Sequence, residues 1–343
     1  MIKNLFGLIG LIFIAVGIYW WVNSHQSSTN EVVVYTSVDE VFARPVAERF
    51  EQDTGIKVRL VPDTEETKST GLLNRLMAEK KRPQADVFWS GDPVRAAILK
   101  SKGVSAPYQS PQAEGLPKQF SDPEGHWTGF SARARVLIYN RNLVPQGEEP
   151  NTIMDLLAPR FKGKVCIANP LFGTTSMHAA ALFAVLGEDK AKAFFEGFIH
   201  NGGTILSSNG EVRRRVAAGE FAVGITDTDD ANVALTEGKP VGVAFPDADG
   251  MGTLIIPNCA VLIQDGPNPD AGQQFIDYLL QPETEKMLAE SEAAQMPLRP
   301  NVLIPENVIS LENLTPMPVD YGKLAVALET LSQGFLKEWV DGQ

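Results

Sequence analysis

The sequence is poor in the residues that build metal centres and disulfide frameworks. Its 343 residues include two cysteines and four histidines. Cys166 and Cys259 lie far apart, with no CxxC pair and no Cys/His cluster, so we expect neither a zinc site nor a set of disulfides. Two buried thiols that pack as small apolar side chains are the favoured interpretation, and a Cys166–Cys259 bridge is the alternative.

Basic residues are scarce relative to acidic ones. There are 30 Lys and Arg against 42 Asp and Glu, which gives a formal net charge of −12. A nucleic-acid partner requires a basic face, so this charge argues against that class of partner. It does not argue against a small anionic ligand, because the local charge of a pocket can oppose the net charge.

The usual motifs of hydrolytic enzymes are missing. No G-x-S-x-G sequence is present, which argues against a Ser-His-Asp hydrolase. Asp227 and Asp229 follow an apolar stretch and resemble in part the D-x-D motif of haloacid-dehalogenase-type phosphotransferases. The position two residues later is Ala231 instead of Thr or Val, and no matching lysine motif follows. We therefore expect a binding protein without a cofactor, and a phosphotransferase or phosphatase that uses Asp227 and Asp229 is the alternative from another class.

One long apolar run is present, at the N-terminus. After Lys3, residues 5–22 read LFGLIGLIFIAVGIYWWV, which is just long enough to cross a bilayer and ends in interfacial aromatic residues. No small-x-small cleavage site follows. Residues 1–24 are therefore interpreted as an uncleaved signal-anchor, with a cleaved signal peptide as the alternative and residues 25–30 as a linker. Both interpretations place the rest of the chain outside the cytoplasm.

The remaining sequence alternates predicted strands and helices. Strands are predicted at 31–37, 56–62, 85–91, 131–140, 163–170, 218–226, 241–246 and 252–263, and helices at 44–55, 64–83, 174–187 and 268–291. Strand–helix repeats of this length indicate doubly wound α/β sheets. We predict a two-lobed α/β fold with chain crossings near 128–135 and 245–252. Lobe 1 comprises residues 31–130 plus 250–343, including C-terminal helices, and lobe 2 comprises 131–249.

A ligand is expected in the cleft between the lobes. Gly173, Thr174 and Thr175 stand between a strand and a helix, and free amides and hydroxyls at a helix start form an anion site. An ordinary helix cap is the alternative. Arg133 and Arg135 project from one face of their strand, where one can bind an anion while the other pairs with an aspartate.

Polar residues also follow several predicted strands. Because ligands bind at the carboxyl ends of strands in open α/β sheets, these residues are candidates by position. They are Ser37, Asp39, Glu65, Ser90, Asp92, Asp227 and Asp229. The alternative for each acidic residue is a solvated loop.

Several segments together resemble a known family. VVVYTSVDEVFARPVAERFEQDTGIKV, ADVFWSGDP, SARARVLIYN, NPLFGTTS and MPLRP (296–300) are similar, in the same order, to periplasmic ferric-iron-type (family 1) solute-binding proteins of ABC importers. The similarity spans most of residues 31–310. It implies a two-lobed periplasmic-binding-protein fold (type II-like) with two crossing hinge strands, which closes on a ligand and docks on a membrane permease.

The usual iron ligands of that family are all changed in this sequence. The resemblance puts Asp39 at the position of a histidine and Gly91 at the position of a glutamate, with Asp92 one residue later. It puts Thr228 and Asp229 at the position of a tyrosine pair. The family's anion contact corresponds to Gly173, Thr174 and Thr175, which are retained as small or hydroxyl residues.

The resemblance and the residues together predict a monomeric substrate-binding protein of an ABC importer, without catalytic activity. The predicted ligand is a small anionic organic solute, phosphorylated or phosphonate-like. The alternative is ferric iron or another metal, with carboxylate ligands from Asp39, Asp92, Asp227 and Asp229.

Overall fold

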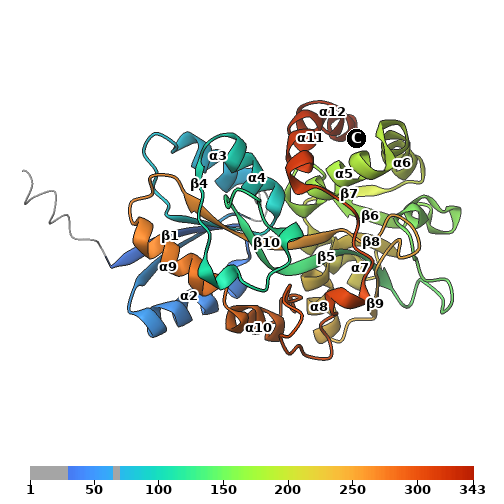
Figure 1. Cartoon of the computed structure of the whole chain (residues 1–343). Helices are drawn as coiled ribbons and strands as arrows, with labels where there is room; N and C mark the ends of the chain where they lie inside the picture. The colour runs from blue at the N-terminus through green and yellow to red at the C-terminus, as the bar shows by residue number, and fades with distance from the viewer. Residues whose placement is uncertain (1–29, 65–69) are drawn as a thin grey trace, which may run out of the picture.

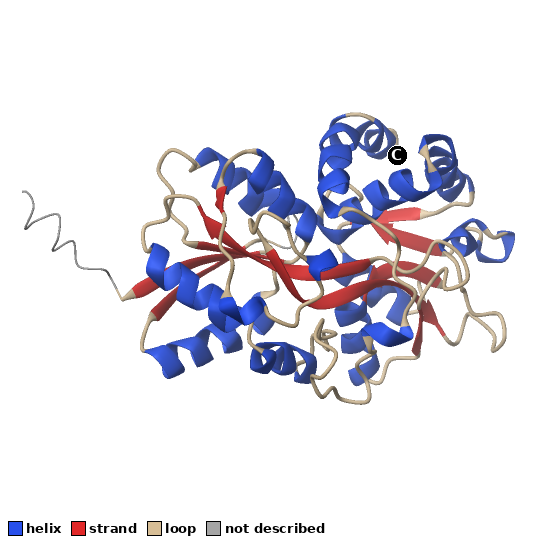
Figure 2. Cartoon of the chain, viewed as in Figure 1, coloured by secondary structure: helices blue, strands red, loops and turns tan. Residues whose placement is uncertain are grey.

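A computed structural model describes residues 30–64 and 70–343, which form two α/β lobes joined through one sheet (Figures 1 and 2). The two-lobed fold predicted from the sequence is confirmed. The predicted signal-anchor at 1–24 and linker at 25–30 fall almost wholly outside the described residues. Within the described ranges, no helix has the length and apolarity needed to cross a bilayer.

The first lobe is built on parallel strands. β1 pairs with both β2 and β3, and its buried β-branched residues Val32, Val33 and Val34 account for its central place. Its strands are β1 (Glu31–Thr36), β2 (Lys57–Pro62), β3 (Val87–Ser90) and β4 (Ser105–Ala106). Its helices are α2 (Glu40–Thr54), α3 (Thr70–Ala78), α4 (Pro93–Ser101), α9 (Pro269–Leu279) and α10 (Pro282–Glu290).

The second lobe repeats this strand–helix pattern. β6 lies between β7 and β8 and is parallel to both. The strands are β6 (Val165–Ala168), β7 (Thr204–Leu206), β8 (Val223–Asp227) and β9 (Val241–Ala244). The helices are α5 (Gly173–Leu186), α6 (Glu188–His200), α7 (Asn209–Ala217) and α8 (Thr228–Thr236).

Short 3₁₀ helices occur in several parts of the chain, at Pro111–Ala113, Lys118–Phe120, Ile153–Leu157, Pro159–Phe161 and Leu311–Asn313.

Two antiparallel strands connect the lobes, β5 (Thr128–Asn140) and β10 (Ile255–Ile263). β5 pairs with β10 as far as Ala134 and with β8 from Arg135 onward, so it changes partner between these two residues. The first crossing was predicted at this place. The second crossing was predicted at 245–252, but this stretch ends in a turn, and the chain returns beside β5 just after it. The glycines and aspartates there favour a turn over a strand.

The last two helices, α11 (Tyr321–Gln333) and α12 (Phe335–Asp341), lie on the side of the molecule where α4 and α5 meet (Figure 1). α11 packs against both α4 of the first lobe and α5 of the second. Trp339 of α12 donates from its indole nitrogen to the carbonyl of Phe195, 3.2 Å away, in the second lobe. The C-terminal helices therefore contact both lobes, while the division of the chain into domains stays a prediction.

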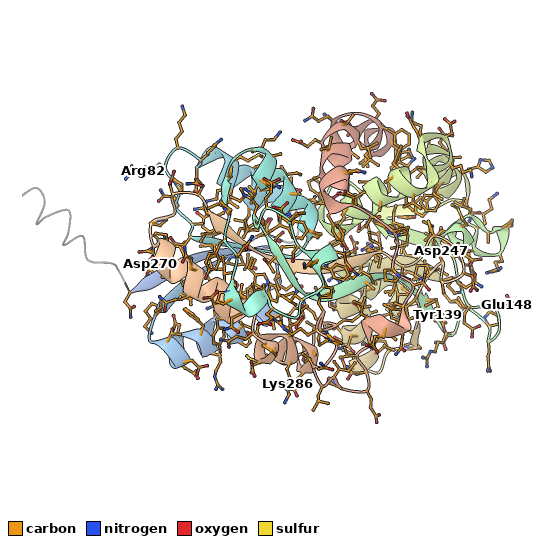
Figure 3. The ribbon with its side chains drawn as sticks, viewed as in Figure 1. Arg82, Tyr139, Glu148, Asp247, Asp270 and Lys286 are labelled. Atoms are coloured by element: carbon orange, nitrogen blue, oxygen red, sulfur yellow. The ribbon has the colours of Figure 1, made fainter. Side chains whose placement is uncertain are left out.

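Charged side chains lie mostly on the surface, and the two cysteines lie in the core. Charged side chains such as Arg82, Glu148 and Lys286 point outward around the periphery (Figure 3). Cys166 and Cys259 are both buried and unpaired, which confirms the favoured interpretation of the two thiols.

Candidate ligand-binding cleft

A polar pocket lies where strand ends of both lobes meet the first turns of α5, α7 and α8. Ser37 and Asp39 come from the first lobe, Arg133 comes from the crossing strand β5, and the other lining residues come from the second lobe. The lining residues of the second lobe are Ala168, Asn169, Phe172, Gly173, Thr174, Thr175, Ser207, Ser208, Asn209, Asp227, Asp229 and Asp230. The pocket is thus an interlobe site, as the sequence predicted.

The first turn of α5 presents unpaired backbone donors to this pocket. Its N-cap is Phe172, which has no side chain able to cap the helix. Among the described residues, no acceptor is found for the backbone N–H groups of Gly173, Thr174 and Thr175. Gly173 adopts φ 53°, and a Cβ built on it would meet no atom within 4 Å. Three backbone amides without a described acceptor thus lie at the positive end of a helix dipole, in residues that line the pocket, and this arrangement suits an oxyanion.

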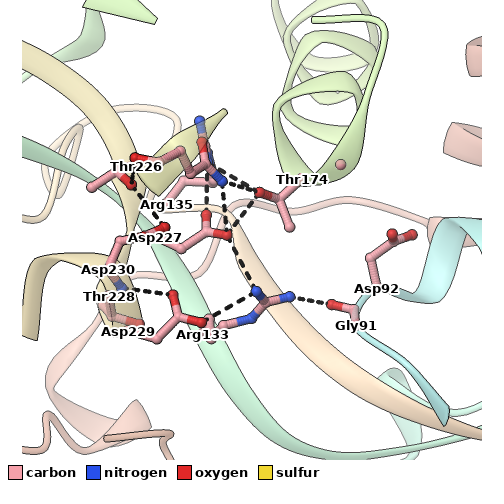
Figure 4. Close-up of polar contacts among 12 residues, drawn as sticks. Gly91, Asp92, Arg133, Arg135, Thr174, Thr226, Asp227, Thr228, Asp229 and Asp230 are labelled. Carbon is pink, nitrogen blue, oxygen red and sulfur yellow. Dashed lines mark hydrogen bonds and ion pairs between the residues drawn. The ribbon is translucent and has the colours of Figure 1, made fainter. Parts of the chain in front are cut away.

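Behind these amides, Arg135 and Asp227 form a fully buried ion pair (Figure 4). Arg135 Nη1 lies 2.7 Å from Asp227 Oδ1, and both side chains are almost completely inaccessible to solvent. Thr174 donates from its hydroxyl to Asp227 Oδ2 at 2.7 Å, and Asn209 donates to the same oxygen at 3.2 Å. Burial raises the pKa of the Asp227 carboxyl, but the two arginines and the Thr174 hydroxyl lower it more, so the pKa lies below its usual value. This pair fixes β5, β8, α5 and α7 around the pocket.

Arg133 extends into the pocket and contacts both lobes (Figure 4). Its Nη1 lies 3.4 Å from Asp227 Oδ2 and 3.4 Å from Asp229 Oδ2 in the second lobe. Its Nη2 donates to the carbonyl of Gly91 in the first lobe. Burial lowers the pKa of this guanidinium, but the charges of Asp229, Asp227, Asp39 and Asp92 raise it further, so Arg133 is firmly cationic. The two arginines predicted on one strand face thus divide their roles between a buried ion pair and the pocket.

Most of the residues predicted for the site line this pocket. They are Ser37, Asp39, Arg133, Gly173, Thr174, Thr175, Asp227 and Asp229. Ser90 and Asp92 do not line the pocket and are fully buried. The Ser90 hydroxyl donates to the Asp92 carbonyl, and the Asp92 carboxylate caps α4. Thr228 accepts a hydrogen bond from the backbone of Ala134 and does not line the pocket. Glu65 lies outside the described residues.

The sequence prediction missed one wall of the pocket. Ser207, Ser208 and Asn209 follow β7, a strand of only three residues that the hydrophobic pattern did not indicate. Ser208 accepts a hydrogen bond from the backbone of Glu211 and caps α7. A Ser-Asn pair with an acidic residue soon after it is a helix-start signal that was available in the sequence. Asp230, which the sequence analysis did not include among the candidate residues, lines the pocket as well.

The guanidinium of Arg133 contacts two of the four carboxylates proposed as metal ligands, Asp227 and Asp229. Asp39, Asp92, Asp227 and Asp229 all interact electrostatically with its guanidinium. Within residues 30–64 and 70–343, no group of three or more His, Cys, Asp or Glu side chains has a geometry that could hold a metal ion. The described side chains therefore do not fit a metal bound by the protein alone.

Comparison with known proteins identifies the family. The sequence profile of the bacterial extracellular solute-binding proteins matches residues 82–320. The chain belongs to this family. Iron uptake protein A1 of Synechocystis is 29% identical over 306 residues, which cover 86% of this chain and 81% of the relative.

Two solved structures show the same fold. The Trichodesmium protein IdiA (FutA), in complex with iron and citrate ligands, is 25% identical with a TM-score of 0.73, covering 88% of this chain and 98% of its own. The Actinobacillus pleuropneumoniae protein AfuA, with exogenous fructose-6-phosphate bound, is 24% identical with a TM-score of 0.79, covering 91% and 98%.

Family membership confirms the resemblance stated from the sequence and the role that it implied. The protein is an extracytoplasmic substrate-binding protein of an ABC importer, with a small-molecule ligand and a membrane permease as partners. Relatives are named for iron uptake and for ferric iron binding, which corresponds to the alternative ligand stated from the sequence and not to the phosphorylated organic solute. The lack of catalysis, the monomeric state and the membrane anchor stay predictions.

Proposed function

We propose that this solute-binding protein captures ferric iron as an anionic chelate, such as a complex with a hydroxycarboxylate, and not as a bare ion. One observation carries this proposal. The cleft carboxylates Asp227 and Asp229 are engaged by arginine, whereas the amides at the start of α5 have no acceptor among the residues that the structure describes. A chelate brings its own metal ligands and presents outward-facing carboxylate oxygens, which those amides bind.

The relatives support iron as the cargo. The Synechocystis relative is named as an iron uptake protein, and the Trichodesmium structure holds both iron and citrate. Fe(III) is a hard cation that prefers oxygen ligands. A chelator that fills most of the coordination shell of the metal removes the need for tyrosine and histidine ligands, which are not found among the described residues that line this pocket.

A second candidate ligand is a phosphorylated organic solute. The hydroxyl and amide side chains of Thr175, Ser207, Ser208 and Asn209 favour it, because such groups bind phosphate and sugar hydroxyls. The similar structure with bound fructose-6-phosphate supports the same chemistry. Both candidates place an oxyanion at the start of α5 and differ in whether a metal accompanies it.

Thermal melting with a small ligand panel separates the candidates. The panel contains Fe(III)-citrate, redox-inert Ga(III)-citrate, citrate alone, fructose-6-phosphate and a phosphonate. A ligand at 100 times its Kd stabilises the folded state by about 2.7 kcal/mol, which raises Tm by several degrees. We expect both metal citrates to raise Tm and citrate alone to have little effect. A shift with fructose-6-phosphate and none with the metal citrates would overturn the iron proposal.

A matched pair of variants tests the anion site itself. Gly173→Asp and Gly173→Asn both fit the positive φ and the open space at this position, because Asp and Asn tolerate it better than other residues do. Only Asp adds a negative charge beside the α5 amides. We expect Gly173→Asp to abolish binding of Ga(III)-citrate and Gly173→Asn to retain most of it, measured by calorimetry. Equal affinities in the two variants would rule out an oxyanion at this helix.

A further inference from the structure

Arg133 lies where a cation would be expected in this pocket. Its guanidinium contacts Asp227 and Asp229, and the charges of Asp39 and Asp92 also act on it. Arg135, two residues along the strand, is fully buried and bonded to Asp227, Thr174, Thr175 and Asn209. Arg133 is different, because its side chain is 11% exposed and lines the pocket.

The backbone of the first lobe leaves room for this guanidinium. A Cβ added to Gly91 would lie 3.2 Å from Arg133 Nη2, closer than an ordinary carbon–nitrogen contact. The same Cβ would lie 3.4 Å from the carbonyl and the hydroxyl of Ser37. A side chain at position 91 would therefore crowd the guanidinium of Arg133 where it now lies. The Arg133 Nε has no hydrogen-bond partner among the described residues, although it is buried.

A guanidinium and a metal ion differ in the groups that each needs around it. A guanidinium carries a permanent positive charge, has only donors, and leaves further N–H groups for an incoming anion. A hard metal ion at the same place needs several carboxylate oxygens directly in its coordination shell. The two cannot share Asp227 and Asp229, because both attract the same carboxylate oxygens and repel each other.

We propose that Arg133 determines the class of ligand: it occupies the carboxylate cluster as a built-in cation, excludes free hard cations from the cleft, and selects cargo that carries its own anionic groups. This inference rests on the site of the proposed function but not on the identity of the proposed ligand. Arg133 contacts the ligand through hydrogen bonds to an anionic oxygen, while the aspartates hold the guanidinium in place.

Terbium(III) alone is the probe for the exclusion of cations. The lanthanide is a hard trivalent ion, and its luminescence and equilibrium dialysis report affinity and stoichiometry. Wild-type protein is compared with Arg133→Gln, with Asp229→Asn, with the double variant Arg133→Gln/Asp229→Asn and with Arg49→Gln. Arg49 is an exposed helix residue that pairs with Asp53, so its replacement removes the same charge away from the cleft and controls for binding to the acidic surface.

We expect Arg133→Gln to bind one additional Tb³⁺ at least about tenfold more tightly than wild type or Arg49→Gln. Addition of Asp229→Asn should remove that gain. In the single variant Arg133→Gln, affinity for Ga(III)-citrate should fall about tenfold or more. A folded Arg133→Gln protein that binds Tb³⁺ no better than Arg49→Gln overturns the proposal. So does a wild-type Tb³⁺ site that Asp229→Asn alone removes.

Gly91→Ala provides a second test if Arg133→Gln does not fold. It keeps Arg133 but pushes the guanidinium away from the Gly91 carbonyl. We expect a gain in Tb³⁺ affinity between those of wild type and Arg133→Gln, and the lack of any gain counts against the proposal. The Tb³⁺ results do not depend on the chelate, so failure of Ga(III)-citrate to bind wild type refutes only the proposed function.

Discussion

At the scale of single residues, the Arg135–Asp227 pair carries the strongest consequence for stability. Both side chains are fully buried, so removing the charge of Asp227 leaves the Arg135 guanidinium without its ion-pair partner in a poorly solvated place. We expect Asp227→Asn to lower the free energy of unfolding by about 3–5 kcal/mol, measured by urea denaturation. Asp53→Asn, which breaks an exposed pair with Arg49, serves as the control and should cost at most about 1 kcal/mol.

The same residue predicts a dependence on pH. The pKa of the Asp227 carboxyl is lower in the folded protein than its ordinary value near 3.8. Its contribution to stability is therefore complete above that ordinary value and is lost as the pH falls through the folded pKa. Between neutral pH and strongly acidic pH, wild type should lose more stability than Asp227→Asn. Parallel curves for the two proteins would show that Asp227 is not the group responsible.

Residue types and strand positions were enough to find most of the pocket from the sequence. Asp39, Thr174 and Asp227 follow predicted strands, Arg133 lies within one, and the structure brings all four together. Which of the two arginines forms the buried pair with Asp227 was not predictable, because Arg133 and Arg135 are equivalent in the strand pattern. Only the packing of α5 and α7 over β5 buries Arg135 and leaves Arg133 in the pocket.

At the scale of elements, α12 joins the end of the chain to the second lobe. Trp339 is nearly buried, donates to the Phe195 carbonyl and meets the Phe195 ring edge-to-face at 5.0 Å. We expect Trp339→Ala to destabilise the protein by about 3–5 kcal/mol. Trp339→Phe, which keeps a ring but loses the donor, should cost about 1 kcal/mol. Equal losses in urea denaturation would show that the hydrogen bond, and not the packing, attaches α12.

The hydrophobic period predicted whether a segment is a helix or a strand. It predicted less well where each helix or strand begins and ends. The predicted helix at 268–291 is two helices, because Pro282 begins α10 just after α9 ends at Leu279. The helix predicted from Arg44 begins at Glu40, since Pro45 lies inside α2 and does not start it. The three-residue strand β7 is too short to give a period, and the pocket wall that follows it was missed for this reason.

At the scale of the whole molecule, the core does not stop at the lobe boundary. One continuous cluster of buried apolar side chains includes Val33 and Tyr35 of the first lobe and Phe194 and Phe198 of the second. β5 pairs with strands of both lobes, and α11 packs on helices of both. Lobes that share a sheet, a helix and a core are expected to unfold together.

This cooperativity is tested by one core variant in each lobe. Phe275 of α9 and Phe198 of α6 are both completely buried, and replacement by alanine should cost about 3–5 kcal/mol in each case. Hydrogen exchange read by mass spectrometry follows β1 and β8 separately as urea is added. We expect either variant to lower the midpoint of both strands equally. If Phe198→Ala lowers the midpoint of β8 and leaves that of β1 unchanged, the lobes unfold independently, and the shared strands act only as a hinge.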